Sequence, residues 1–161
     1  MRRLVPIATV ASLAIALAAA LPAPPAAAFL FGRKKPAYDW TALGTEFCAR
    51  SLAGDLAGIR PLISGELAAD IDRAAATGPL PPTRILFQTY ENAVPVCRVR
   101  TMSAALVEVE RSNPNGAPPA WKEYLVIAPE RDGTSRIDDV LFATRRSDTL
   151  RARLRTWAAG E

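Results

Sequence analysis

Apolar and polar residues alternate over residues 96–101 and 106–111, and a period of two is typical of a half-buried β-strand. The short connection at Ser103-Ala104-Ala105 predicts a tight turn, so the two strands would pair antiparallel. Opposite charges then meet on one face, and each cross-strand pair contributes roughly 0.2–1 kcal/mol. The predicted register places three pairs of residues opposite each other: Val99 and Val109, Arg98 and Glu110, and Arg100 and Glu108.

Two further strands follow a loop rich in Asn, Gly and Pro at residues 113–119. Residues 121–128 are apolar on both faces from Tyr124 onward, which predicts a central strand. Asp132-Gly133 has the composition of a hairpin turn and leads into a last strand over residues 137–143. The four strands together predict an antiparallel meander.

The residues before the meander have helical patterns. An apolar stripe of helical period, capped by Asp39 and ended by Gly54, predicts the first helix. Asp55 would cap a short second helix over residues 56–59, and Ser64 a third helix. The stripe of the first helix consists of Trp40, Leu43, Phe47 and Ser51, and the inward residues of the third are Leu67, Ile71 and Ala74.

Gly and Pro at residues 77–82 interrupt the helical pattern. The segment from Ile85 to Tyr90 fits either a short edge strand or one turn of helix. After the meander, Ser147 would cap a last helix. Its apolar face consists of Leu150, Leu154 and Trp157, and the face predicted to be solvated carries Arg151, Arg153 and Arg155.

These elements predict an α+β fold in which N-terminal helices pack on a curved antiparallel sheet of about four strands, followed by a C-terminal helix. The predicted organisation is one α+β domain over residues 39–158 with a short tail at 159–161.

Two pieces of the chain, FCARSLAGDLAGIRPLIS at residues 47–64 and SRIDDVLFA at residues 135–143, resemble the nuclear-transport-factor-two-like superfamily of cone-shaped α+β domains. The chain looks most like the small exported members of unknown function. The first piece resembles the family's helix, Gly-Asp joint and short helix, and the second its final strand, with Ile137 and Val140 as core positions. The resemblance implies a curved sheet wrapped on a long helix, often around an apolar pocket.

That superfamily includes ketosteroid isomerase, dehydratases and many non-catalytic binding domains, so the resemblance does not define a function. The predicted C-terminal helix departs from the commonest family pattern, in which the last strand ends the domain. It would either leave the cone open as a pocket or plug it with Leu154 and Trp157.

Residues 1–28 have the three parts of a secretory signal. Arg2-Arg3 gives a positive start, residues 4–21 are apolar, and Ala26-Ala27-Ala28 is a small-residue cleavage site. We expect cleavage between Ala28 and Phe29 and a periplasmic or secreted protein in a bacterial-type cell envelope; an uncleaved membrane anchor is the alternative.

Residues 29–38 are predicted to form a flexible N-terminal segment. It combines apolar and cationic side chains that would rest weakly on an anionic membrane surface. The favoured interpretation is a solvated tail that keeps the cleavage site accessible, and the membrane contact is the alternative. The residues of the proposed membrane contact are Phe29, Phe31, Arg33, Lys34 and Lys35.

The mature chain holds two cysteines, Cys48 and Cys97, and a disulfide is expected in an oxidising compartment. Closing a loop of about 50 residues stabilises by roughly 4 kcal/mol in the chain-entropy model. A catalytic thiol would need a neighbouring base, and the chain contains no histidine.

The absence of histidine excludes Ser-His-Asp and Cys-His catalysis and HExxH zinc sites. The Gly-rich motifs that bind nucleotide phosphates are also missing. A net charge of +4 without a long basic run argues against a nucleic-acid partner. Asp70 and Asp72 point about 200° apart on a helix and do not share a metal ion, so we expect neither a metal nor a cofactor.

Asp138 and Asp139 are the one pair of residues that could carry catalysis. A regular strand sends them to opposite faces, whereas a β-bulge at this point would let Ile137 and Val140 share the core face. The favoured interpretation is structural: Asp139 lies inward and is held by backbone N–H groups or by an arginine. The arginines considered are Arg136, Arg98 and Arg100.

In the catalytic alternative, one of these carboxylates enters an apolar cone, which raises its pKa as a general base requires. Tyr90 or Tyr124 would then supply an oxyanion donor, as tyrosine does in the isomerase relatives. Two classes of function therefore follow from the sequence. The favoured class is an exported non-catalytic binding or interaction domain for a small apolar ligand or another protein. The alternative is a histidine-free isomerase or dehydratase using an Asp and a Tyr.

Overall fold

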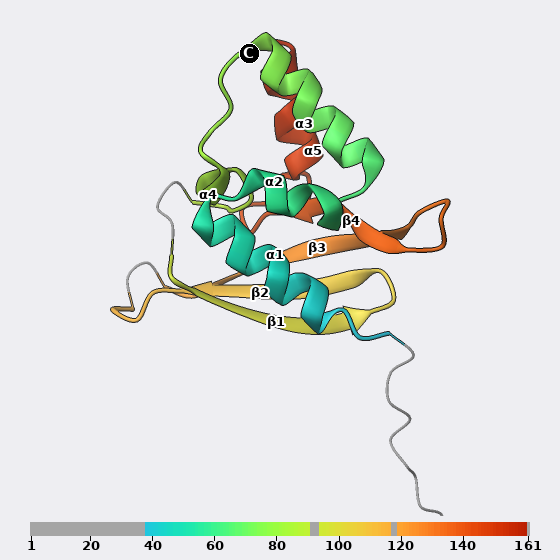
Figure 1. Ribbon diagram of the computed structural model, residues 1–161. Coiled ribbons are helices and arrows are strands. Elements are labelled where there is room, and N and C mark those ends of the chain that lie inside the picture. The colour runs from blue at the N-terminus through green and yellow to red at the C-terminus, as the bar shows by residue number, and fades with distance from the viewer. Residues whose placement is uncertain (1–37, 91–93, 117–118, 161) are drawn as a thin grey trace, which may run out of the picture. The chain divides into compact units, whose positions relative to one another are not determined.

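The computed structural model describes residues 38–90, 94–116 and 119–160. These residues form helices, then a four-stranded antiparallel meander, then a C-terminal helix (Figure 1). The predicted α+β class is confirmed. The predicted signal peptide, its cleavage site and the proposed membrane contact over Phe29 to Lys35 lie outside the described residues.

The strands form one sheet in the order β1-β2-β3-β4. They are β1 (Val96–Ser103), β2 (Leu106–Ser112), β3 (Trp121–Pro129) and β4 (Ser135–Leu141). The predicted register is confirmed, because Val99 pairs with Val109, Arg98 with Glu110 and Arg100 with Glu108. The prediction of β3 as a central strand is also confirmed, since β3 pairs with both β2 and β4.

Alternate strand residues form the sheet side of the core. Val107, Val109 and Leu125 are at most 1% exposed. The register of β3 and β4 shifts because Val126 pairs with Asp139 while Ile127 pairs with Ile137, which leaves Asp138 as an extra residue. The predicted β-bulge is therefore present, and it places both Ile137 and Val140 in the core.

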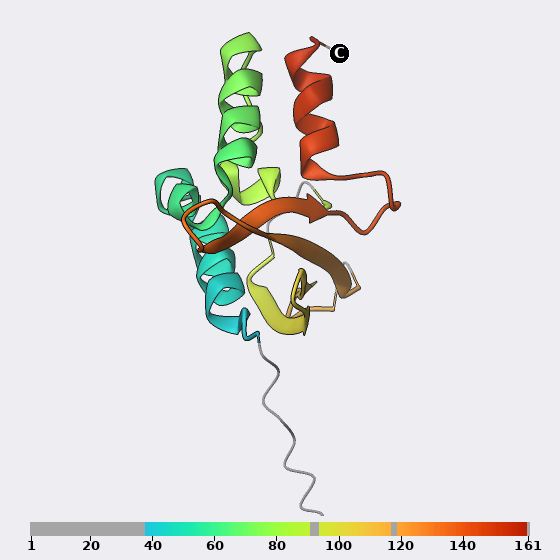
Figure 2. The ribbon, with the colours of Figure 1, turned by 90° about the vertical axis from the view of Figure 1, so that its right-hand side faces the viewer.

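The helices are α1 (Thr41–Ala53), α2 (Leu56–Ile59), α3 (Gly65–Thr77), α4 (Thr83–Leu86) and α5 (Leu150–Ala158), with a short 3-10 helix at Arg60–Leu62. Side chains of Asp55 and Ser64 cap α2 and α3 as predicted, by accepting the backbone N–H groups of Gly58 and Leu67. Figures 1 and 2 show α3 and α5 side by side beyond the β4 edge of the sheet.

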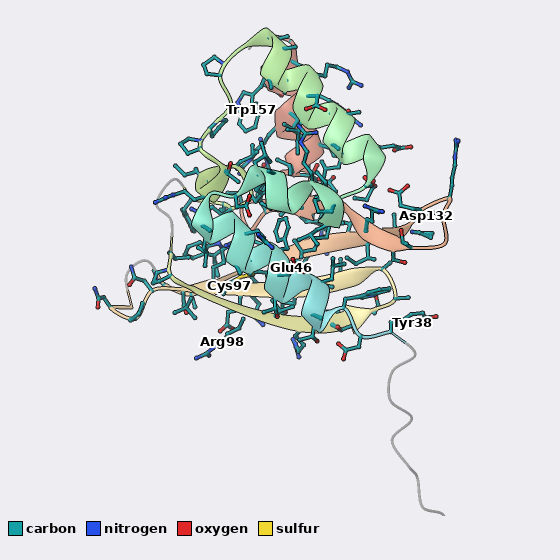
Figure 3. All side chains as sticks on the ribbon, viewed as in Figure 1. Tyr38, Glu46, Cys97, Arg98, Asp132 and Trp157 are labelled. Atoms are coloured by element: carbon teal, nitrogen blue, oxygen red, sulfur yellow. A yellow bond between two sulfur atoms is a disulfide. The ribbon has the colours of Figure 1, made fainter. Side chains whose placement is uncertain are left out.

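Helix α1 lies across β1 and β2 and is fastened to β1 at two points (Figure 1). The predicted disulfide between Cys48 and Cys97 is present, with 6.1 Å between the two Cα atoms. Trp40 donates its backbone N–H to Thr101 and its indole N–H to the carbonyl of Ala104. Figure 3 shows Cys97 on the helix side of β1 and Arg98 pointing to the opposite side.

Two predicted helix caps need correction, and the choice left open for residues 85–90 is settled. The N-cap of α1 is Trp40, although the Asp39 carboxylate still accepts the N–H of Thr41. Helix α5 is capped by Thr149, not by Ser147, because residues 146–147 form a turn and Thr149, which is extended, forms a bridge with Leu141 before the helix begins. Between Ile85 and Tyr90 the chain has a helical turn at its start and no strand.

Leu154 is 1% exposed and belongs to the main core, and Trp157 packs against that core. The N-terminal end of α3 covers part of the β4 edge, since Ser64 donates its backbone N–H to Ile137 at 2.8 Å. Among the described residues, no helix is long and apolar enough to cross a membrane.

Gly44 sets how closely α1 approaches the sheet. A Cβ atom at this position would lie 2.6 Å from a methyl group of Val99 and 3.2 Å from one of Val107. Valine is stiff at χ1, so it does not move aside without strain. Gly44→Ala should therefore lower the free energy of unfolding by about 1–2 kcal/mol, although alanine favours helix.

Gly65, at the start of α3, is the matched control because a Cβ there would meet no atom within 4 Å. Gly65→Ala should be neutral or stabilise by up to about 1 kcal/mol. Urea unfolding of both variants with the disulfide intact measures the difference. Equal stability of the two variants would contradict the close approach of α1.

Candidate functional site

The structure places Asp138 and Asp139 beside the start of α5. The Asp138 carboxylate accepts hydrogen bonds from the Ser64 hydroxyl at 2.7 Å and from Arg151 at 3.1 Å. Asp139 accepts the backbone N–H groups of Val140 at 2.8 Å and Arg151 at 3.0 Å. Asp139 is thus held by backbone donors, as predicted. It does not lie inward, because the bulge gives the core positions to its neighbours.

The arginine that bonds both aspartates is Arg151. It is not one of the three arginines considered from the sequence. Its guanidinium group bonds Glu66 and Asp70 of α3, each at 3.0 Å, together with Asp138 of β4. The prediction that Arg151 is solvated was wrong: the side chain is 18% exposed, because this position on α5 faces the acidic residues of α3. Arg151 therefore ties α5 to both α3 and the sheet.

The arginines considered from the sequence have other partners. Arg98 and Arg100 pair with Glu110 and Glu108 across β1 and β2. Arg136 donates to the carbonyl of Pro61 at 2.7 Å.

Arg153 was also predicted to be solvated, and this too was wrong. It forms two hydrogen bonds with Asp148, at 2.8 and 2.9 Å, and its guanidinium carbon lies 3.7 Å from the centroid of the Phe142 ring. Arg153 thereby packs the chain between β4 and α5 against the helix.

The tyrosines of the catalytic alternative lie apart from the two aspartates. Tyr90 is 46% exposed and packs edge-on against Trp121, with 4.7 Å between the ring centroids. Tyr124 is half-buried on the sheet face away from α1, where it pairs with Leu141. The hydrogen bonds that the structure gives Asp138 and Asp139 come from Ser64, Arg151 and Val140, so neither tyrosine is among their donors.

The most deeply buried charges were missed in the sequence. Arg111 and Glu123 are each 1% exposed and form an ion pair at 2.5 Å between β2 and β3. Glu123 also accepts the indole N–H of Trp121 at 3.0 Å and the backbone N–H of Thr89. Arg111 donates to the carbonyl of Phe87 at 3.0 Å.

A signal for this pair was available in the alternation of the strands. Arg111 follows Val107 and Val109 at intervals of two, and Glu123 stands between Trp121 and Leu125 at the same interval. Residues two apart share a face, so both charges belong to the inward face. Buried charges of opposite sign on neighbouring strands are stable only as a pair.

An open cleft of about 830 Å³ lies at the end of the sheet where β3 begins and β4 ends. Tyr124 and Leu141 belong to its floor and face away from the core, because their neighbours Leu125 and Val140 are at most 1% exposed on the core side. Its apolar lining residues are Ala120, Trp121, Tyr124, Leu141, Phe142 and Ala143, and its charged lining residues are Lys122, Arg145 and Arg146.

Hydrogen bonds hold one wall of this cleft. The backbone N–H of Ala143 donates to the Thr89 hydroxyl at 2.9 Å, and that of Phe142 to the carbonyl of Asp148 at 2.9 Å. Thr144 also donates to Asp148. The view in Figure 2 shows this connecting chain between β4 and α5 on the side of the sheet away from α1.

No group of three or more acidic, cysteine or histidine side chains that could hold a metal ion occurs in the part of the chain that the structure describes. A scan of protein-family models found no match to the chain. Searches among curated proteins and among solved structures found no significant match either.

Arg151, Glu66, Asp70 and Asp138 form a charged cluster, which we call the Arg151 cluster. The pH dependence of stability, measured through Asp70, tests its role. Burial alone would raise the pKa of Asp70, but hydrogen bonds from Arg151 and Arg73 outweigh it and hold the pKa below its ordinary value. A carboxyl with a lowered folded-state pKa stabilises above its unfolded pKa, near about 3.9, and loses this contribution as the pH falls through the folded value. Asp70→Asn should cost about 1–3 kcal/mol at pH 7, and the cost should shrink below about pH 4.

The control is Asp72→Asn on the same helix, where the side chain is 58% exposed and pairs with Arg60. Its cost should stay under about 1 kcal/mol, because exposed ion pairs contribute little. Urea unfolding of both variants between pH 3 and pH 7 is the measurement. A loss at Asp70 that does not change with pH would contradict a charge-based role for the cluster.

Proposed function

We propose that this protein is an exported, non-catalytic binding domain that holds a small apolar molecule in the cleft at the β3–β4 end of the sheet. The observation that carries the proposal is the apolar floor of the cleft, formed on a surface whose neighbouring positions are charged. An apolar recess with a few polar groups at its margin is the usual form of a small-molecule site.

Export is supported by the disulfide between Cys48 and Cys97, which is compatible with a periplasmic or extracellular location. The order of helix, short helix, helix and meander supports the proposal that the domain is related to the nuclear-transport-factor-two-like superfamily. A binding role is favoured over catalysis because Asp138 and Asp139 are engaged by Ser64 and by the start of α5 and do not border the cleft.

Ala143 offers a way to fill the cleft, because it is small, exposed and part of the lining. The neutral dye N-phenyl-1-naphthylamine, which fluoresces in apolar surroundings, should bind the wild-type protein saturably. Ala143→Trp should weaken that binding at least about tenfold, since the indole would occupy the space of the dye. Fluorescence titration of the oxidised protein is the measurement.

Ala76→Trp serves as the matched control, because Ala76 is exposed on α3 and does not line the cleft. This variant should bind the dye as the wild type does. Equal weakening in both variants, or no saturable binding by the wild type, would remove the cleft as the binding site.

A further inference from the structure

The charged residues that line the cleft are all cationic. Lys122, Arg145 and Arg146 are exposed at its margin, and no carboxylate of the described residues lines it. The Lys122 ammonium group is shared with Glu108, which it contacts at 3.2 Å. The charge that a ligand would meet therefore comes mainly from the two adjacent arginines.

Arg145 and Arg146 form no ion pair with any of the described residues. The carboxylate nearest to them in sequence, Asp148, already receives two hydrogen bonds from Arg153 and one from Thr144. Many of the other arginines of the domain do have a carboxylate partner, among them Arg98, Arg100 and Arg151. Hydrogen bonds from Arg153 lower the pKa of Asp148, and Arg145 also helps to lower it through its charge, without forming an ion pair with it. Two guanidinium groups that form no ion pair with the described residues thus stand beside an apolar floor.

A ligand that covers such a floor places its own polar end at the margin. A cationic end would be repelled there, a neutral end would gain nothing, and an anionic end would form charge-assisted hydrogen bonds. We infer that the cleft takes an amphipathic anion of the fatty-acid type, with its chain on Tyr124 and Leu141 and its carboxylate at Arg145 and Arg146. This inference rests on the proposed function and names the class of ligand for the same cleft.

Three ligands with the same ten-carbon chain separate the contribution of charge from that of the chain: decanoate, 1-decanol and decyltrimethylammonium. Displacement of N-phenyl-1-naphthylamine from the oxidised protein, below the concentrations at which the ligands form micelles, gives the three affinities. Decanoate should bind about fivefold more tightly than decanol, because exposed ion pairs each contribute up to about 1 kcal/mol. Decyltrimethylammonium should bind more weakly than decanol.

Salt and two double variants test whether the arginines cause the preference. Raising the ionic strength from about 0.01 M to about 1 M shortens the Debye length from about 30 Å to about 3 Å, so the ratio of decanoate to decanol affinity should fall toward one. Arg145→Gln with Arg146→Gln should have the same effect. Arg84→Gln with Arg155→Gln removes the same charge from exposed positions that do not line the cleft, and it should leave the ratio as in the wild type.

The outcomes separate the two proposals. If the dye and decanol bind but decanoate has no advantage, or if its advantage survives loss of both cleft arginines, the anionic ligand class is wrong and apolar binding stands. If decyltrimethylammonium binds more tightly than decanol, the anionic ligand class is likewise wrong. If neither the dye nor any ten-carbon ligand binds, the proposed function itself fails. Salt dependence in the wild type gives a readout that requires no variant to fold.

Discussion

The buried ion pair between Arg111 and Glu123 is the interaction on which the rest of the domain depends. Both side chains are 1% exposed, and removal of one partner from such a pair typically costs about 3–5 kcal/mol because the other charge stays buried. The pair connects three segments of the chain, namely β2, β3 and residues 87–89. It does so because it also bonds Phe87, Thr89 and Trp121. The segment after α4 has little regular structure and is held to the sheet by these polar contacts.

The same pair determines the shape of the surface cleft. Glu123 orients the Trp121 indole, which lines the cleft, and fixes the backbone of Thr89, whose hydroxyl accepts the N–H of Ala143 in the cleft wall. This buried charge interaction therefore positions residues that line the cleft at the end of the sheet. Arg151 has a parallel role at the start of α5, where it joins helix α3 to the bulge of β4. Arginine suits both places because its planar group offers several donors in fixed directions.

The architecture could be read from the sequence because it follows from local patterns. Alternation predicted the strands, charge pairing predicted the register of Arg98 and Arg100, and two cysteines in a chain with a predicted export signal predicted the disulfide. The partners of Arg151 could not be predicted, because they lie on α3 and β4 and depend on how the helices pack. The cleft was missed for a similar reason. Tyr124, Leu141 and Ala143 meet only after β3 pairs with β4 and the chain beyond β4 turns back toward α5.

Amide hydrogen exchange in the Arg111→Met variant tests most directly whether the buried pair holds the cleft wall. Under conditions in which the variant stays folded, the amides of Thr89 and Ala143 should exchange faster than in the wild type, while that of Ile71 in α3 should keep its protection. Arg100→Met, which removes an exposed partner of Glu108, is the control and should change neither site. Unchanged protection at Thr89 and Ala143 in Arg111→Met would contradict the claim that the pair organises the cleft.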